Sequence, residues 1–237
     1  MASTLAQQAD EQFGITLSPE QTAQFAQYAE VLAAWNAHTN LTAITEPAAV
    51  QVRHFLDSLS IAQVVPMRSG LRLIDVGTGA GFPGLPLLIA FPHIRVTLLE
   101  ATGKKVNFLD HVIAQLGLRG AQTLHARAEE AGHMPDQRAA YDLVLARAVA
   151  RLPALVEYLL PLARIGGQCI AMKGDTAADE ARDAARAIDL MGGRFNRIET
   201  IELPDIDEPH RLVIIDKVAH TPRTYPRKPG TPTHVPL

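Results

Sequence analysis

The sequence predicts a Rossmann-like, doubly wound α/β domain built on a seven-stranded, mostly parallel sheet. Two observations predict this fold. From residue 71 onward, apolar runs of strand length alternate with segments of helical pattern, as in parallel sheets covered by helices. The first run, residues 71–76, leads into glycines at positions 77, 79, 81 and 84 and then into a short apolar helix at 85–91. Strand, glycine turn and helix together open a nucleotide-binding βαβ unit.

The later elements follow from the same alternation. Glycines mark the C-terminal ends of two expected helices. Gly117 ends one, and Gly192 with Gly193 ends the other. A short loop or helix should begin at 128–130. No helix separates the last two strands, which should therefore pair antiparallel. The expected strands after the first are 94–99, 121–124, 141–145, 168–173, 194–202 and 211–217, and the expected helices are about 104–116, 153–163 and 176–191.

Three parts are expected along the chain. Residues 1–68 should form a helical extension packed on the domain of residues 69–219, and residues 220–237 form a basic, proline-rich tail. The stretch 221–237 carries five prolines, which favour extended surface chain. This tail could wrap the domain, contact RNA or be a plain C-terminal arm.

Two helices are expected within the extension. Ser18 supplies an N-cap and Pro19 the first helical position. Apolar residues recur at helical spacing up to Trp35, where a polar loop at 35–42 should end the helix. A second helix should start at residues 45–47 and end at Val65 and Pro66.

Composition bounds the class of protein. The 237 residues are 47% hydrophobic and 20% charged, which suits a soluble globular protein with one sizeable core. The net charge of −3 gives no global sign of nucleic-acid binding. Its distribution is uneven, because residues 1–70 hold two basic residues against six acidic ones and residues 211–237 hold five against one. A local basic patch is therefore expected at the C-terminal end.

Compartment and assembly follow from what the sequence lacks. Cys169 is the single cysteine and lies in an apolar run, which fits a reducing compartment. Residues 1–17 do not have the pattern of a signal peptide, and no apolar run approaches the roughly 18 residues of a membrane span. We expect a cytoplasmic protein that does not enter a membrane, with a monomer as the default state. No metal-ligand set is predicted.

The glycine turn has two interpretations. Residues 79–84 match the G-x-G-x-x-G pattern of dinucleotide sites. Asp75 stands two residues before Gly77, and with Gly79 it gives the pattern D-x-G-x-G-x-G, typical of S-adenosyl-L-methionine (AdoMet) sites. Pro83 would remove one of the backbone amides that a pyrophosphate uses. The sequence therefore favours AdoMet over NAD as the cofactor, bound by Asp75, Gly77 and Gly79.

Two further positions are placed to hold this cofactor. Glu100 ends the second strand, where an acid can accept hydrogen bonds from ribose hydroxyls. Ala128 and Glu129 follow the third strand, where adenine contacts arise in this fold. Glu129 could equally be an ordinary acid at a helix start.

The end of the fourth strand indicates the chemistry by exclusion. Its residues 145–149 lack the N/D-P-P-Y-like loop of enzymes that methylate exocyclic amines. Cys169 resembles buried core rather than the nucleophile that pyrimidine C5 methylation needs. What remains is transfer to an atom that already offers a lone pair, such as guanine N7, which needs alignment but no general base. Arg147 could orient the guanine or a phosphate, or could be a surface salt bridge.

Polar residues elsewhere are candidate RNA contacts. Lys173 ends the fifth strand at the carboxyl edge of the sheet, where ligands bind in open α/β sheets. Asn40 lies in the polar loop of the extension. His54 lies beside Phe55 on a helix and alone would more often be a structural histidine.

Several motifs together resemble one family over nearly the whole chain. In order they are WNAHTNLTAIT, VRHFLDSL, LIDVGTGAGFPGLPL, LLEATGKKVNFL, ARAEE, LARAVA, AMKG and YPRKPGTP. The chain resembles the glucose-inhibited-division protein B family, also called methyltransferases G of small-subunit ribosomal RNA. One departure is His210, where the family commonly has arginine and this chain has Arg211 one place along.

The resemblance implies AdoMet-dependent N7 methylation of one guanine in the decoding-region loop of bacterial 16S rRNA, with the rRNA or the small ribosomal subunit as partner. It implies cofactor contacts by Gly77, Phe82, Glu100, Ala128, Glu129 and Arg147, and RNA-binding or active-site roles for Asn40, His54, Lys173 and Arg147. Two alternatives stay open at this point. A methyltransferase acting on a small molecule or protein would have a closed pocket without a basic rim, and a non-catalytic nucleotide-binding module would prefer NAD.

Overall fold

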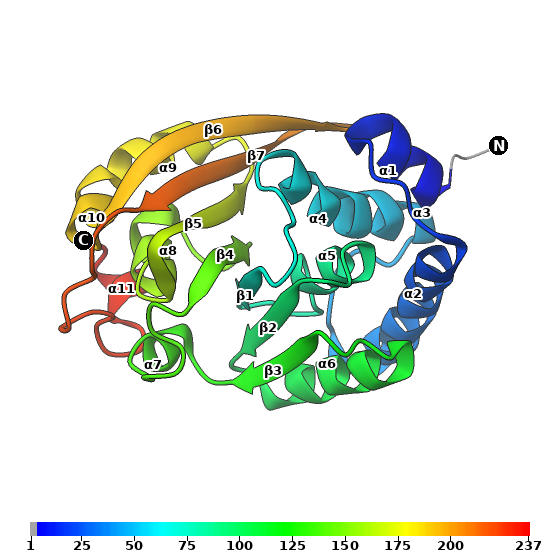
Figure 1. The fold of residues 1–237 in the computed structure, drawn as a ribbon, viewed down its shortest axis with the longest axis horizontal. Coiled ribbons are helices and arrows are strands. Elements are labelled where there is room, and N and C mark those ends of the chain that lie inside the picture. The colour runs from blue at the N-terminus through cyan, green and yellow to red at the C-terminus, as the bar shows by residue number, and fades with distance from the viewer. Residues whose placement is uncertain (1–3) are drawn as a thin grey trace.

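The computed structural model describes residues 4–237 and confirms the seven-stranded sheet (Figure 1). The strand order is β3-β2-β1-β4-β5-β7-β6, and only β7 runs against the other strands. The predicted antiparallel pairing of the last two strands is therefore confirmed. The strands are β1 Arg72–Val76, β2 Arg95–Glu100, β3 Ala121–His125, β4 Tyr141–Arg147, β5 Ala163–Lys173, β6 Gly193–Leu203 and β7 Ile206–Lys217.

Helices cover both faces of the sheet and divide the apolar interior into two clusters. The helices of the N-terminal extension share one cluster with α5 and α6, and α8, α9 and α10 share the other. The helices are α1 Leu5–Phe13, α2 Pro19–Thr39, α3 Pro47–Val50, α4 Asp57–Leu59, α5 Gly84–Ala90, α6 Gly103–Leu116, α7 Ala128–Ala131, α8 Leu152–Leu159, α9 Ala177–Asp183, α10 Ala185–Leu190 and α11 Thr231–His234. Across residues 4–237, none of them has both the length and the apolarity that a bilayer crossing requires.

The extension is helical as predicted, with two differences. Ser18 caps α2 through a capping box with Gln21. The predicted loop at 35–42 is wrong for residues 35–39, because α2 continues to Thr39, where Trp35 packs on Phe108 and His111 of α6. The second predicted helix is present as α3 and α4, joined by a π-helical turn at Gln51–Leu56 and followed by a 3-10 turn at Ser60–Gln63.

Three boundaries in the second half differ from the predictions. The helix expected at 153–163 ends at Leu159, because Ala163 already pairs with Tyr141 and begins β5. The helix expected at 176–191 is two helices that meet at Ala184. Strand β7 begins five residues early, since Ile206 pairs with Leu203 across a tight turn. Strand pairing therefore sets the end of α8 and the start of β7.

The β6–β7 hairpin reaches beyond the sheet to the N-terminal helices (Figure 1). Ile201 and Leu203 belong to the same apolar cluster as those helices, with Ile206 packed against it. The hairpin and the extension thereby meet at the carboxyl edge of the sheet. The strand order reverses between β1 and β4 at this edge, which is where ligands bind in open α/β folds.

Candidate functional site

The glycine turn after β1 forms the floor of the site. Gly77 has a left-handed backbone, with φ of 67°, which a residue with a side chain adopts only at a cost. A Cβ at Gly77 would lie 2.7 Å from Val149 Cγ2. Glycine is therefore required at this position both for the turn and for the close approach of the segment that follows β4.

Asp75 fixes the shape of the turn. It is fully buried, and its Oδ2 accepts hydrogen bonds from the Thr78 hydroxyl at 2.6 Å and the Gly84 amide at 2.9 Å. Burial raises the pKa of Asp75 to about 6, against these two hydrogen bonds, which lower it. Within residues 4–237, Oδ1 has no hydrogen-bond partner. Asp75 thus ties the start of the turn to the start of α5.

Glu100 fixes the neighbouring wall. The Gly79 amide donates to Glu100 Oε2 at 3.1 Å, and the Thr102 amide donates to Oε1 at 2.8 Å. Each carboxylate oxygen can accept more than one hydrogen bond, so capacity remains for a ligand hydroxyl. The carboxylate is almost buried, yet it borders a cavity at the ends of β1 and β2.

This cavity of about 240 Å³ is the candidate cofactor site. Four predicted cofactor residues line it, namely Gly77, Glu100, Ala128 and Glu129. The other lining residues are Val76, Leu99, Ala101, Ala126, Arg127, Val149, Ala150, Tyr158, Gly230 and Thr233. Apolar side chains together with acids and hydroxyl groups suit a nucleoside, which presents a flat ring and ribose hydroxyls. The residues therefore fit the expected cofactor.

Four other predicted cofactor residues do not line the cavity. Asp75 and Gly79 lie behind it and hold the turn and Glu100 in place. The Phe82 ring packs among aromatic residues of the extension. Arg147 ends β4, and the next residue, Ala148, has a left-handed φ of 56°. After this turn Val149 borders the cavity while Arg147 contacts the extension. Direct cofactor contacts by these four residues stay predictions.

Arg147 is the centre of a cluster of charged and aromatic residues. Its Nη1 donates to Asp57 Oδ2 at 3.0 Å and to the Arg53 carbonyl at 2.9 Å. Its guanidinium carbon lies 5.2 Å from the centre of the Phe82 ring. Asp57 is only 2% exposed and accepts on its other oxygen, Oδ1, from His210 Nδ1 at 2.9 Å. Asp57 thereby joins the extension to the end of β4 and to β7.

His54 completes this cluster as a neutral ring. Burial and the adjacent Arg147 lower the pKa of His54 to about 4. Arg147 Nη2 lies 3.1 Å from His54 Nδ1, and because a guanidinium can only donate, we assign Nδ1 as the acceptor. His54 Nε2 then donates to the Thr42 hydroxyl at 2.8 Å. Both ring nitrogens are engaged, and the ring stacks on Phe82 at 4.4 Å.

The remaining predicted residues lie apart from this cluster. Lys173 forms an ion pair with Glu180 at 2.8 Å and donates to the Ala150 carbonyl at 2.5 Å. Burial opposes ionisation of Glu180, but hydrogen bonds from Lys173, the Leu152 amide and Thr176 outweigh it and lower the pKa of Glu180. Lys173 therefore braces the segment after β4. Asn40 is exposed in a left-handed conformation at the end of α2.

Cys169 lies inside the sheet and is not a nucleophile. The thiol is fully buried, and burial raises its pKa to about 12. This agrees with the argument from sequence against a cysteine-dependent mechanism.

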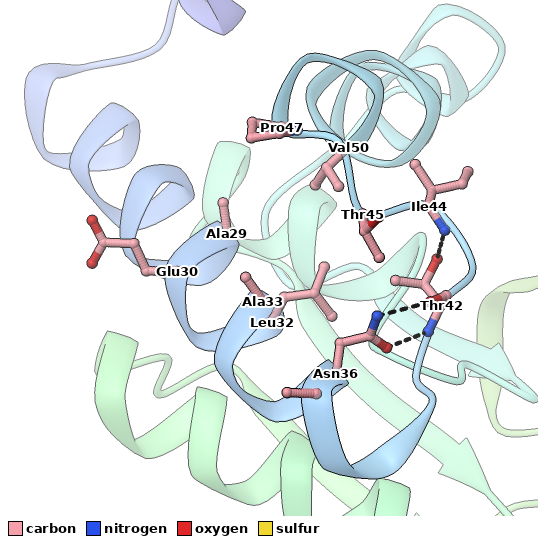
Figure 2. A pocket seen from close by; sticks show the side chains of 11 residues that line it. Ala29, Glu30, Leu32, Ala33, Asn36, Thr42, Ile44, Thr45, Pro47 and Val50 are labelled. Atoms are coloured by element: carbon pink, nitrogen blue, oxygen red, sulfur yellow. Dashed lines mark hydrogen bonds between the residues drawn. The ribbon is translucent and has the colours of Figure 1, made fainter.

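A larger hollow of about 520 Å³ lies on the extension, between α2 and the chain leading into α3 (Figure 2). Its lining is mainly apolar, and Figure 2 shows Asn36 and Thr42 hydrogen-bonded to each other at its edge. Asn36 thereby holds Thr42, which holds His54. The hollow supports the cluster but presents no group with evident chemistry. The other lining residues are Ala29, Glu30, Leu32, Ala33, Ala37, Ile44, Thr45, Pro47 and Val50.

Several functional candidates were missed by the sequence analysis. Asp57 follows His54 by three residues, a spacing that puts both on one helical face and could have signalled their joint role. His210 contacts Asp57 from 153 residues away. No local pattern predicts the lining residues Tyr158, Gly230 and Thr233 either, because they meet only in the folded chain.

Comparisons with known proteins show the family of the chain. The model of the family described as rRNA small subunit methyltransferase G matches residues 21–207. The ribosomal RNA small subunit methyltransferase G of Geobacillus kaustophilus is 45% identical over 237 residues, 100% of both chains. The protein of the same name from Pelotomaculum thermopropionicum is 46% identical over 237 residues, 100% of this chain and 99% of the relative.

Solved structures confirm the fold class. A SAM-dependent methyltransferase from Aquifex aeolicus has a TM-score of 0.56 at 14% identity, covering 75% of this chain and 97% of its own. Geranyl diphosphate methyltransferase in complex with GPP and sinefungin has a TM-score of 0.54 at 11% identity, covering 69% and 78%. At such identities the likeness concerns the fold alone.

Proposed function

The chain belongs to the family of rRNA small subunit methyltransferase G, and from this premise we propose that it methylates N7 of a guanine in the decoding-region loop of bacterial 16S rRNA. The cofactor is S-adenosylmethionine. We further propose that the protein acts as a cytoplasmic monomer.

One observation carries the choice of N7. Neither His54 nor Asp57, the two titratable groups of the extension beside Arg147, is ready to take up a proton. His54 is neutral with both ring nitrogens engaged, and each oxygen of Asp57 accepts from a cationic or imidazole partner. Methylation of an exocyclic amine releases a proton that a base should accept, whereas N7 offers a lone pair and has no proton to lose. The engagement of both His54 and Asp57 by Arg147 and its neighbours supports N7 as the acceptor.

The residues that line the cavity are proposed to bind AdoMet and to orient it. AdoMet, when bound, supplies a methyl group activated on a sulfonium. Glu100 is placed to accept from the ribose hydroxyls. Ala128 and Glu129 border the region proposed for the adenine, and the absence of a side chain at Gly77 leaves room beside the cavity. These residues contribute alignment, which is the main demand of a direct displacement.

Arg147 is proposed to bind RNA at the cofactor's edge. The purine gains positive charge during transfer, so a guanidinium suits contact with guanine O6 or a phosphate rather than with the ring. Asp57 neutralises part of its charge and restricts its orientation. The basic residues of the C-terminal end could add phosphate contacts, in which case activity on RNA should fall as salt rises.

The test is to locate the transferred methyl group. The full-length protein is incubated with methyl-labelled AdoMet and, separately, with protein-free 16S rRNA and small ribosomal subunits. Borohydride and aniline treatment then cleaves the RNA at 7-methylguanosine. We expect one labelled, cleavable guanine in the decoding-region loop. Label on an exocyclic amine, on a pyrimidine carbon or only on small solutes would contradict the proposal.

A further inference from the structure

The C-terminal segment, residues 221–237, folds back along the domain instead of leaving it. Arg138 holds its first part, donating from Nη1 to the Tyr225 carbonyl at 2.8 Å and from Nη2 to the Thr221 carbonyl at 2.9 Å. His133 Nε2 lies 2.7 Å from the Pro226 carbonyl oxygen. Figure 1 shows this part of the chain beside α7 and α8. The segment therefore has a defined path.

A buried ion pair anchors the middle of the segment. Glu157 of α8 is fully buried, and Arg227 meets its carboxylate through Nε and Nη2, the shortest distance being 2.7 Å. The backbone amide of Arg227 also donates to Glu157 Oε1 at 2.6 Å. The hydrogen bonds to Glu157 raise the pKa of Arg227 above its usual range. A buried carboxylate with this many donors is satisfied only while the segment stays in place.

Beyond this anchor the chain reaches the cofactor cavity. The Gly230 amide donates to Glu129 Oε1 at 2.9 Å, and the Thr233 hydroxyl lies 3.2 Å from the Tyr158 hydroxyl. Gly230, Thr233, Glu129 and Tyr158 all line the cavity. The segment thus supplies one wall of the cavity and orients the carboxylate of Glu129 within it.

We propose that the C-terminal segment is a working part of the AdoMet site, in which Gly230 and Thr233 form a wall and the Arg227–Glu157 pair holds that wall closed. The inference rests on the assignment of this cavity to AdoMet under the proposed function. It adds positioning residues from the last eleven positions of the chain, of which Arg227 acts without reaching the cavity itself.

Two consequences follow from thermodynamic linkage. If release of the segment opens the cavity, the apparent affinity for the cofactor falls in proportion to the fraction of molecules with the segment docked. By reciprocity, a bound cofactor favours the docked segment. A tail with a merely structural role would lower stability when disturbed but would leave cofactor affinity unchanged in the folded protein.

The first measurement is calorimetric titration of the full-length protein with S-adenosylhomocysteine, which occupies the AdoMet site without reacting. Arg227→Ala should bind about tenfold more weakly, as expected if the segment is docked about a tenth of the time. Arg223→Ala is the matched control, because Arg223 is exposed in the same segment and makes no side-chain hydrogen bond among residues 4–237. It should bind as the wild type does. Circular dichroism must show both variants folded at the titration temperature.

The second measurement is tryptic cleavage of the wild type after Arg223 and Arg227. S-adenosylhomocysteine should slow cleavage at these sites but not after exposed Arg68, which lies on another part of the chain. Truncation after residue 220 gives a variant without the wall, which should bind at least as weakly as Arg227→Ala.

The outcomes separate this inference from the proposed function. Wild-type affinity in a folded truncation, or an Arg227→Ala variant whose segment resists trypsin as the wild type does, would overturn the inference. If the wild type binds neither AdoMet nor S-adenosylhomocysteine, the cofactor assignment is wrong. The proposed role of the C-terminal segment is then wrong as well. If binding depends on the segment but the labelled atom is not guanine N7, the wall stands and only the proposed acceptor is wrong.

Discussion

Both ends of the chain return to the carboxyl edge of the sheet, but they hold different groups there. The N-terminal extension brings Asp57 and His54 to Arg147, mainly through charged and aromatic side chains. The C-terminal segment brings a backbone amide, that of Gly230, to Glu129. One end surrounds the Arg147 guanidinium with a carboxylate and aromatic rings, and the other lines the cavity itself.

The difference indicates a division of labour. A fixed guanidinium with a partly neutralised charge suits recognition of RNA, whose position must be set at each turnover. A wall of backbone and small side chains suits a cofactor of constant shape. Changes at the C-terminal end should therefore act on cofactor affinity, and changes at the N-terminal end should act on the transfer step.

The largest effect should come from Gly77→Asp, which disturbs the cofactor cavity and not the Arg147 cluster. Its side chain would strike Val149 in the cavity wall, and we expect calorimetry to show a loss of cofactor affinity of about 100-fold or more, equivalent to ~2.7 kcal/mol. Gly117→Asp is the control, because Gly117 has a similar φ of 64° but a Cβ at that position would meet no atoms within 4 Å. Equal losses in both variants would show that backbone strain, not the cavity, is responsible.

The next largest effect should come from Asp57→Asn, which disturbs the Arg147 cluster and not the cofactor cavity. Without the carboxylate, Arg147 loses its fixed orientation, and misplacement of a positioning group by about 1 Å can cost roughly 100-fold in rate. Single-turnover rates on rRNA should fall by that order while cofactor affinity stays within about twofold of the wild type. Asp142→Asn removes an acid that accepts from Arg164 at the opposite edge of the sheet, so it should lower stability and spare the rate.

The pH dependence of stability should distinguish the glycine turn from the cluster. Asp75 has a pKa raised to about 6, so the folded state holds its proton between pH 4 and 6 and Asp75 makes stability fall as pH rises. His54 has a pKa lowered to about 4, so the unfolded state holds the proton between pH 4 and 6.5 and His54 makes stability rise with pH. Each effect is on the order of 3 kcal/mol.

Urea unfolding at pH 4.5, 5.5 and 6.5 measures these two slopes. Asp75→Asn should make stability rise more steeply with pH than in the wild type, and His54→Gln should make it rise less steeply. Parallel curves for all three proteins would show that neither group has a shifted pKa.

The smallest effects should come from substitutions of two threonines, one in the N-terminal extension and one in the C-terminal segment. Thr42→Val removes the acceptor for His54 Nε2, and Thr233→Val removes the partner of the Tyr158 hydroxyl. A single hydrogen bond contributes roughly 0.5–1.5 kcal/mol, or about two- to tenfold. Thr42→Val should lower the single-turnover rate and Thr233→Val the cofactor affinity. The reverse pattern would contradict the division of labour.

Sequence reasoning identified the elements whose signals are local. The apolar run before Gly77, the acid at Asp75 and the acid at Glu100 depend on a few neighbouring residues, and the structure places all three around one turn. The helix over residues 35–39 was missed because Trp35 packs on Phe108 and His111 of α6, which follow it by more than seventy positions. Tertiary packing there overrides a polar local sequence.

The contacts that complete the site could not be predicted in this way. The partner of Arg147 lies 90 residues earlier in the chain, and the partner of Glu129 lies 101 residues later. The basic, proline-rich composition of the tail was compatible with a tail that wraps the domain, with one that contacts RNA and with a plain C-terminal arm. Contacts with distant residues show that it is docked, among them the ion pair between the buried Glu157 and Arg227 of that tail.

The most direct test is to measure cofactor affinity and the single-turnover rate at saturating cofactor in the same preparations of Arg147→Ala and Arg227→Ala. The account predicts a crossed result: Arg147→Ala loses rate and largely keeps affinity, and Arg227→Ala loses affinity and largely keeps rate. If both variants lose both quantities to the same extent, the two ends of the chain do not serve separate steps, and the account is contradicted.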